Sequence, residues 1–454
     1  MNYAECLDYL ADLGCELRGV KFDLATIRRL LDSLGNPHLR YPTAIVAGTN
    51  GKGSTCAMLA SILDCAGYRT GLYTSPHLVR VNERIRVGGR EISDESFAES
   101  FTQVRDAADG LVASGDFPQR PSFFEFLTAA AFLHFARTRV DFAVLEVGMG
   151  GRLDATNVTE PRVAAITNVE MDHEQFLGTT RAAIAFEKSG VIRAGRPVIS
   201  GSDHPEAMGV IRERSRELGA DLLELPQAAA ISNVRDDDGR FIFDLRLEES
   251  LFPDLAPALP GRFQIQNATT AVAAAGRLQQ QGFKIPLESI AQGLRKVRWP
   301  GRLEAIHTHP LVVLDGAHNP AAAQALAVFV KEEYRGRRLR LVYASMRDKA
   351  IEEISEILFP LATEICLTEP LVGRAAAAEE ILERARCLPE RVFTEPDPVR
   401  ALEAAISRSS EDDVILVTGS LFLVGAIERA LREGKLSFGH AAASPELSTA
   451  LRPA

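Results

Sequence analysis

Cysteine pairs, long apolar runs and an excess of basic residues are all missing from this chain of 454 residues. Its six cysteines show no Cys-x-x-Cys spacing, and 454 residues would be a large body for them to cross-link, so we expect reduced thiols in a cytoplasmic protein. Residues 1–14 carry acidic residues where a signal peptide would carry basic ones, and no apolar run is long enough to span a bilayer. We therefore predict a soluble protein without a membrane segment.

The charge balance limits the partners. A formal net charge of −10 argues against a nucleic-acid backbone or an anionic membrane as the main partner, so any bound anion must be held by local positive groups. Hydrophobic residues at 46% and charged residues at 25% are ordinary for a globular enzyme. The length predicts two or three domains.

The most informative stretch is AIVAGTNGKGSTCA at 44–57. An apolar run meets a loop rich in glycine, and helix-forming residues follow from 54 to 66. Glycines let the backbone adopt positive φ and approach an anion, and the amides at the start of the helix then point at phosphate oxygens. With Lys52 as a mobile cation, the loop predicts a nucleoside triphosphate site made of Thr49, Asn50, Gly51, Lys52, Gly53 and Ser54.

This loop departs from the common G-x-x-x-x-G-K-[ST] pattern. Val46 stands where the first glycine is usual, and Gly53 follows Lys52 in place of Ser or Thr. The loop is therefore a shortened variant. A plain connection between a strand and a helix is the structural alternative.

Three further polar residues follow predicted strands. Ser75 comes after the strand at 69–73, Glu146 lies near the end of the strand at 142–147, and His173 follows the strand at 163–167. Ligand sites gather at the carboxyl ends of parallel strands, and a buried carboxylate needs a partner. Oxygen ligands plus imidazole favour Mg²⁺ or Mn²⁺ over structural zinc. A turn at Pro76 is the structural alternative for the Ser75 segment.

Several groups allow both a structural and a functional interpretation. Ser122 and Glu125 form a capping box, but the aromatic residues between them would also suit a flat heterocycle. Gln264 and Asn267 open an alanine-rich helix at 268–281, where they either complete a tight core or contact a base. Residues 17–22 are either a connector or a loop that closes over a ligand.

The fold prediction is α/β, with a P-loop-type doubly wound N-terminal domain and a smaller Rossmann-like C-terminal domain. We expect the first domain at 1–298, with a small antiparallel β appendage at about 221–259. Strand and helix signals alternate again in the second domain at 299–433, and 434–454 form a flexible tail.

Seven motifs in this order resemble the folylpolyglutamate synthase/dihydrofolate synthase family, a branch of the ATP-dependent Mur-type ligases. They are GTNGKGS (48–54), TSPHL (74–78), EVGMGGRLDATN (146–157), MDH (171–173), EKSG (187–190), WPGR (299–302) and DGAHNP (315–320). The resemblance covers about residues 5 to 430. Ser122 stands where the family usually has threonine, and Ser189 where alanine is frequent.

The resemblance implies a role for each matching residue. Ser75, Glu146 and His173 would bind the metal ion, and Lys188 would carry a carbamate that makes it an anionic ligand. Lys52, Lys188, His173 and Glu146 would be catalytic, and Asn267, Arg302 and Asp315 would join the loop in binding ATP. The substrate residues would be Ser122, Phe123, Phe124, Glu125, Leu153, Asp154 and Ala155 for the pterin, with His318 and Ser420 for glutamate.

The implied reaction joins L-glutamate to a pterin or folate carboxylate through an acyl phosphate. Its cofactors would be ATP and Mg²⁺, with Mn²⁺ an alternative and a K⁺ requirement left open. We expect a monomer whose partners are small molecules, with dihydropteroate or a reduced folate as acceptor. A ligase acting on a cell-wall precursor, which would lack SFFEF and DGAHNP, and a non-catalytic nucleotide switch are the alternatives.

Overall fold

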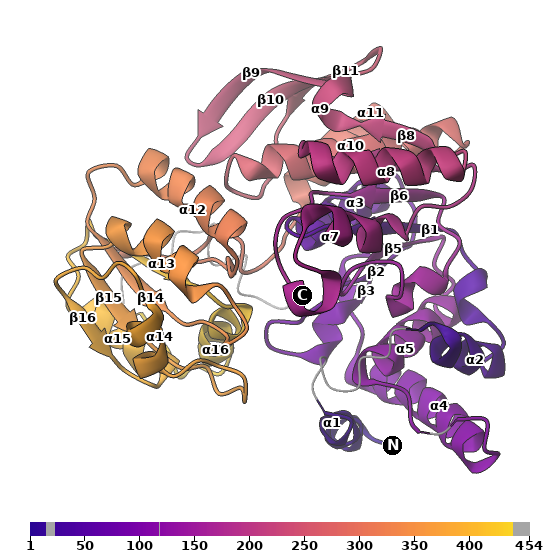
Figure 1. Ribbon diagram of the computed structural model, residues 1–454, viewed down its shortest axis with the longest axis horizontal. Coiled ribbons are helices and arrows are strands. Elements are labelled where there is room, and N and C mark those ends of the chain that lie inside the picture. The colour runs from indigo at the N-terminus through magenta and orange to yellow at the C-terminus, as the bar shows by residue number, and fades with distance from the viewer. Residues whose placement is uncertain (15–22, 118, 439–454) are drawn as a thin grey trace. The chain divides into compact units, whose positions relative to one another are not determined.

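A computed structural model describes residues 1–14, 23–117 and 119–438. The predicted closing loop at 17–22 and residues 439–454 of the predicted tail lie outside this range. The chain forms two compact units (Figure 1). Unit 1 contains Met1–Arg235, Ile242–Ala258 and Gln264–Arg298, and unit 2 contains Asp236–Phe241, Leu259–Phe263 and the chain from Trp299 onward.

Unit 1 is built on an eight-stranded sheet with the order β4-β3-β2-β5-β1-β6-β7-β8. The six strands from β2 to β8 in this order run parallel, and β3 and β4 extend the edge in antiparallel pairings. The strands are β1 (Thr43–Ala47), β2 (Thr70–Tyr73), β3 (Ile85–Val87), β4 (Arg90–Glu91), β5 (Phe142–Glu146), β6 (Val163–Ile166), β7 (Pro197–Ser200) and β8 (Asp221–Glu224).

The central strands β1 and β5 are buried along their whole length, as their apolar runs TAIVA and FAVLE require in a sheet covered on both faces. Phe97, Phe101 and Phe126 stack in the core beside this sheet. The helices of unit 1 are α1 (Tyr3–Asp12), α2 (Ala25–Ser33), α3 (Lys52–Cys65), α4 (Asp94–Ala113), α5 (Phe123–Arg137), α6 (Glu174–Leu177), α7 (Arg181–Ser189), α8 (Pro205–Glu217), α9 (Leu225–Ala228), α10 (Phe263–Gln280) and α11 (Leu287–Lys296).

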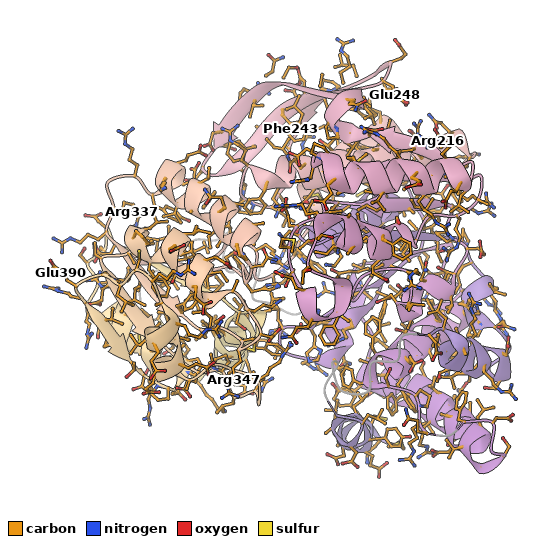
Figure 2. The ribbon with its side chains drawn as sticks, in the orientation of Figure 1. Arg216, Phe243, Glu248, Arg337, Arg347 and Glu390 are labelled. Atoms are coloured by element: carbon orange, nitrogen blue, oxygen red, sulfur yellow. The ribbon has the colours of Figure 1, made fainter. Side chains whose placement is uncertain are left out.

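The antiparallel appendage is shorter than the sequence predicts. Residues 221–224 are β8, which pairs parallel with β7 and completes the large sheet. The small sheet contains only β9 (Ala229–Asp237), β10 (Arg240–Leu247) and β11 (Ser250–Leu255), with Phe243 fully buried in β10 (Figure 2). Glu248 attaches this sheet to α10, because each of its carboxylate oxygens accepts a 3.0 Å hydrogen bond from the Arg277 guanidinium.

Unit 2 contains a six-stranded sheet with the order β12-β13-β17-β14-β15-β16, in which all strands except β12 run parallel. The predicted α/β alternation is present, and the short edge strands β12 and β16 are additions to it. The elements are β12 (Glu304–Thr308), β13 (Leu311–Leu314), α12 (Pro320–Glu333), β14 (Leu339–Tyr343), α13 (Ile351–Leu358), β15 (Glu364–Leu367), α14 (Ala378–Arg384), β16 (Val392–Thr394), α15 (Pro398–Ser407), β17 (Val414–Thr418) and α16 (Leu421–Arg432).

The carboxyl ends of the strands position the candidate residues in both units. In unit 1, β2, β5, β1 and β6 are neighbours, so the loops that follow them emerge at one edge of the sheet. None of the helices within the described ranges has the length and apolar character needed to cross a membrane.

Candidate active site

The loop between β1 and α3 needs its glycines for two measurable reasons. Gly48 and Gly51 have φ values of +145° and +81°, which side chains rarely adopt. A Cβ atom on Gly48 would overlap the Thr167 hydroxyl, and one on Gly51 would overlap Oδ1 of Asn267. The loop is therefore held against Thr167 and Asn267.

Residues that follow β6 fix the shape of this loop. Oδ1 of Asn168 accepts hydrogen bonds from the amides of Thr49 (3.3 Å) and Asn50 (2.9 Å), and the Thr167 hydroxyl donates to the Asn50 carbonyl at 2.6 Å. Thr167 and Asn168 are not among the predicted site residues. They lie directly after the strand β6 and shortly before the MDH motif, and this position at the end of a strand is the pattern that could have identified them.

Two lysine side chains meet at one carbonyl oxygen of the loop. Nζ of Lys188 donates to the Gly48 carbonyl at 2.7 Å, and Nζ of Lys52 donates to the Gly48 and Thr49 carbonyls at 3.0 Å each. Burial lowers the pKa of Lys188 well below its usual value, the charge of Lys52 lowers it further, and Asp172 raises it. The structure thus brings together two of the predicted catalytic residues.

Glu146 and Ser75 also come together at this edge. Glu146 is buried at the end of β5, and one of its carboxylate oxygens accepts a 3.0 Å hydrogen bond from the Ser75 amide. Val46, in β1, is paired with Glu146 in the sheet, so the carboxylate lies in the strand next to the one that begins the phosphate loop.

His173 follows Asp172, whose charge raises the pKa of Lys188. The backbone of His173 has the unusual φ of +52°. The described residues contain no group of three or more His, Cys, Asp or Glu side chains arranged to hold a metal ion. The predicted metal ligands Ser75, Glu146 and His173 supply one hydroxyl, one carboxylate and one imidazole, so they would form a different kind of metal site. Mg²⁺ usually keeps several waters and binds through one or two carboxylates plus substrate phosphates, so Glu146 beside the phosphate loop fits such an ion.

The aromatic residues at the start of α5 lie against the glycine loop after β5. A Cβ atom on Gly148 would meet the Phe124 ring at 2.7 Å, and the Phe124 ring lies 6.0 Å from that of Tyr73. The capping box is present, because Glu125 accepts hydrogen bonds from the amide and hydroxyl of Ser122 at 2.8 Å each. The structural interpretation of Ser122 and Glu125 is therefore correct, and any pterin contact would be additional.

Asp154 shapes the same loop. One carboxylate oxygen accepts the amides of Gly148 and Met149 at 3.0 Å each, and the other accepts the amide and hydroxyl of Thr156. Burial raises the pKa of Asp154, while these hydrogen bonds lower it. The neighbouring Ala155 is buried, and Leu153 is partly exposed.

The remaining predicted residues lie in unit 2. The Asp315 carboxylate accepts the amides of Leu303 (3.0 Å) and Ala317 (2.9 Å). Its burial raises the pKa of Asp315, and the charge of Arg302 opposes that rise.

Within unit 2, the loops after β13 and β17 lie side by side, because the Gly419 amide donates to the Ala317 carbonyl at 3.0 Å. This pairing brings the loop that carries His318 beside the loop that carries Ser420. The Ser420 hydroxyl caps α16 through the Phe422 amide at 3.1 Å.

Comparison with known proteins identifies the family. The Mur ligase middle domain matches residues 46–275, and the glutamate ligase domain of Mur ligases matches residues 301–421. The dihydrofolate synthase/folylpolyglutamate synthase of Bacillus subtilis is 36% identical over 416 residues, which are 91% of this chain and 96% of that protein. This chain belongs to the folylpolyglutamate synthase/dihydrofolate synthase family.

Solved structures of this family have the same fold. The structure of Escherichia coli FolC in complex with DHPP and ADP has a TM-score of 0.85 at 30% identity, covering 96% of this chain and 99% of that chain. The Yersinia pestis bifunctional enzyme complexed with AMPPNP and Mn ion has a TM-score of 0.82 at 32% identity, covering 95% and 98%. The predicted family and fold class are confirmed, and neither alternative is favoured.

Proposed function

We propose that this protein is an ATP-dependent carboxylate–amine ligase that adds L-glutamate to the carboxylate of a pterin or folate. The observation that carries the proposal is the meeting of Lys52 and Lys188 at the Gly48 carbonyl, in a chain with both Mur ligase domains. The E. coli relative was solved with DHPP and ADP, which supports a pterin acceptor and a nucleotide for this chain.

We infer that the loop from Thr49 to Ser54 binds the ATP phosphates. Its amides at the start of α3 and the Lys52 ammonium are the local positive groups that a chain of net charge −10 needs to hold an anion. Asn267, which lies against Gly51, would contact the nucleotide from α10. Arg302 and Asp315 are the proposed nucleotide contacts of unit 2.

Ser75, Glu146 and His173 would hold a divalent cation, which we propose to be Mg²⁺. When bound, that ion neutralises charge on the phosphates during phosphoryl transfer. The Mn ion in the Yersinia structure supports a divalent metal in this family. The Ser75 amide holds the Glu146 carboxylate in place for this role.

The reaction has two steps. A carboxylate oxygen of the pterin or folate attacks the γ-phosphorus of ATP, the bond to the bridging oxygen breaks, and ADP leaves. The glutamate amine then attacks the carbonyl of the acyl phosphate, the tetrahedral adduct expels phosphate, and the amine loses a proton. Lys52 and the loop amides would stabilise the charge that develops on the transferred group.

Lys188 is proposed to act as a carbamate. A neutral amine can attack CO₂ and lose a proton, which leaves an anionic carbamate in place of a cation. Burial and the neighbouring Lys52 lower the pKa of Lys188, so the neutral amine is favoured at this position. An ammonium here would repel the metal, whereas a carbamate would attract it.

The pterin would lie against Phe123 and Phe124 and the loop at Leu153–Ala155, and the glutamate would bind at His318 and Ser420. The glutamate ligase domain matched over 301–421 supports the second assignment. Dihydropteroate as acceptor makes the enzyme a dihydrofolate synthase, and a folate that already carries glutamate makes it a folylpolyglutamate synthase.

The test incubates purified protein with Mg-ATP and glutamate, with dihydropteroate in one reaction and tetrahydrofolate in another, and measures phosphate release and product mass. We expect release of one phosphate per glutamate added with at least one acceptor. Release with one acceptor only identifies the branch. Release with neither acceptor contradicts the folate assignment.

A further inference from the structure

Gln264 is a buried amide with one end paired and the other end unpaired. Its side chain is 1% exposed, and its Oε1 accepts a hydrogen bond from Nδ2 of Asn267 at 2.8 Å. Its Nε2 has no hydrogen-bond partner among the residues that the structure describes. A buried donor without an acceptor costs stability, so such groups need an explanation.

The position of the pair relates this donor to the phosphate loop. Residues three apart on a helix lie on the same face, and side chains lean toward the helix N-terminus, so Gln264 and Asn267 share the N-terminal end of α10. Oδ1 of Asn267 lies so close to Gly51 that no side chain fits there. Gln264 is therefore hydrogen-bonded to Asn267, which contacts the phosphate loop at Gly51.

We propose that Nε2 of Gln264 donates a hydrogen bond to a phosphate oxygen of the bound nucleotide and that its Oε1 orients Asn267 against the phosphate loop. This inference rests on the proposed function. A phosphate oxygen only accepts hydrogen bonds, so it is the chemical partner that an unpaired N–H group lacks. The side-chain amide of Gln264 on α10 and the backbone amides at the start of α3 would then bind the same phosphate group.

Gln279, on the same helix, provides the contrast. Its Nε2 donates to the carbonyl of Ile285, so that amide serves a structural purpose within unit 1. A Gln→Glu change at either position replaces an N–H donor with a carboxylate oxygen of the same shape. Only at Gln264 should the change affect nucleotide binding.

The experiment measures the Kd of AMPPNP, ADP and AMP with Mg²⁺ by calorimetry for the full chain, Gln264→Glu, Gln264→Met and the control Gln279→Glu. We expect both Gln264 variants to raise the Kd of AMPPNP and ADP by ~10-fold or more, because a hydrogen bond to a charged group is lost. The Kd of AMP should change less, and Gln279→Glu should bind like the parent.

A second readout separates this role from a structural one. Gln264→Met removes the unpaired Nε2 donor but also the acceptor of Asn267, so the two effects offset and the ligand-free variant should melt close to the temperature of the parent while its Kd rises. Gln264 variants that bind AMPPNP within about twofold of the parent would overturn the inference. An equal loss for AMP would overturn the phosphate assignment, and a parent that binds no nucleotide would overturn the proposed function itself.

Discussion

The amine of Lys188 lies 2.7 Å from the carbonyl oxygen of Gly48, and it reaches that oxygen from a helix 140 residues further along the chain. Lys52 donates to the same oxygen from the first residue of α3. The two amines are close enough for the charge of Lys52 to disfavour protonation of Lys188. This relationship connects the phosphate loop with the group that we propose to be carbamylated.

Lys188→Ala is expected to abolish turnover, and added bicarbonate should not restore it, because alanine has no amine to carbamylate. The loss should be at least ~100-fold, as for other preorganised charged groups in active sites. The measurement is phosphate release with both acceptors. Lys296→Ala, at an exposed position of α11, is the control. Near-parental activity of Lys188→Ala would remove the carbamate from the mechanism.

Gly51→Ala should abolish nucleotide binding. Its Cβ would meet Oδ1 of Asn267 in a backbone conformation that already costs alanine ~1–3 kcal/mol. Gly67 is the matched control, because its φ of +91° is similar but no atom lies within 4 Å of its Cβ position. Calorimetry should show lost binding for Gly51→Ala alone. Equal binding by both variants would show that the contact with Asn267 is unimportant.

The sequence predicted most elements because their patterns are local. The apolar runs of β1 and β5 and the glycines around Lys52 specify a strand, a loop and a helix without reference to the rest of the chain. The prediction that residues 221–224 belong to the antiparallel appendage was wrong for a different reason. A strand of four residues with two leucines between two acidic residues pairs equally well with a hairpin or with β7, and only the tertiary structure decides between them.

Glu146→Gln tests the proposed metal site. The glutamine keeps an oxygen that accepts the Ser75 amide but loses the negative charge. Affinity for Mn²⁺, measured by electron paramagnetic resonance with AMPPNP, should fall by at least ~10-fold, since even indirect partners of metal ligands contribute that much.

Glu83→Gln is the control for Glu146→Gln. Glu83 is also a buried carboxylate, but its oxygens accept the amides of Leu78, Val79 and Arg80, which makes it a structural group of the loop after β2. Its replacement should lower the melting temperature and leave Mn²⁺ affinity within about twofold. Metal binding by Glu146→Gln at the parental affinity would contradict the assignment of this ligand.

Arg340 should dominate the stability of unit 2. Its guanidinium lies between the carboxylates of Glu364 and Asp413, and all three side chains are at most 10% exposed. Arg340→Leu leaves two buried charges without their partner, which should cost ~3–5 kcal/mol of unfolding free energy in urea. Arg386→Ala, which breaks an exposed pair with Glu356, should cost less than ~1 kcal/mol. Similar losses for both variants would contradict the importance of burial.

Glu333 should make the stability of unit 2 depend on pH. Burial, a hydrogen bond with Asp236 and the charges of Asp236, Glu332 and Asp238 raise the pKa of Glu333 from 4.5 to about 7. Its contribution to stability is therefore full below pH 4.5 and is lost as the pH rises through about 7. Glu333→Gln should raise the melting temperature at pH 8 and change it little at pH 5.

The control for this pH effect is Glu356→Gln, because the Glu356 side chain is exposed, lies 3.2 Å from Arg386 and is not among the charges that act on Glu333. It should not raise the melting temperature at pH 8. A Glu333→Gln variant with no difference between pH 5 and pH 8 would show that this carboxyl titrates normally.

The candidate site was predictable where chemistry is tied to a motif. Lys52 and Glu146 are unusual residues in their local context, whereas Lys188 was named only because the EKSG motif resembles that of the family. Thr167, Asn168 and the unpaired end of Gln264 are ordinary residues whose importance depends on which loop they face. Their contacts join segments about 120 to 215 residues apart, and no local pattern encodes such a distance.

The acyl-phosphate intermediate is tested most directly with an oxygen isotope. Acceptor labelled with ¹⁸O in the carboxylate that is to be joined to glutamate is turned over with Mg-ATP and glutamate, and the released phosphate is analysed by mass spectrometry. Activation as an acyl phosphate transfers one carboxylate oxygen to phosphorus, so each phosphate released from fully labelled acceptor should contain one ¹⁸O atom. Amide product accompanied by phosphate without ¹⁸O would rule out activation of the carboxylate as an acyl phosphate.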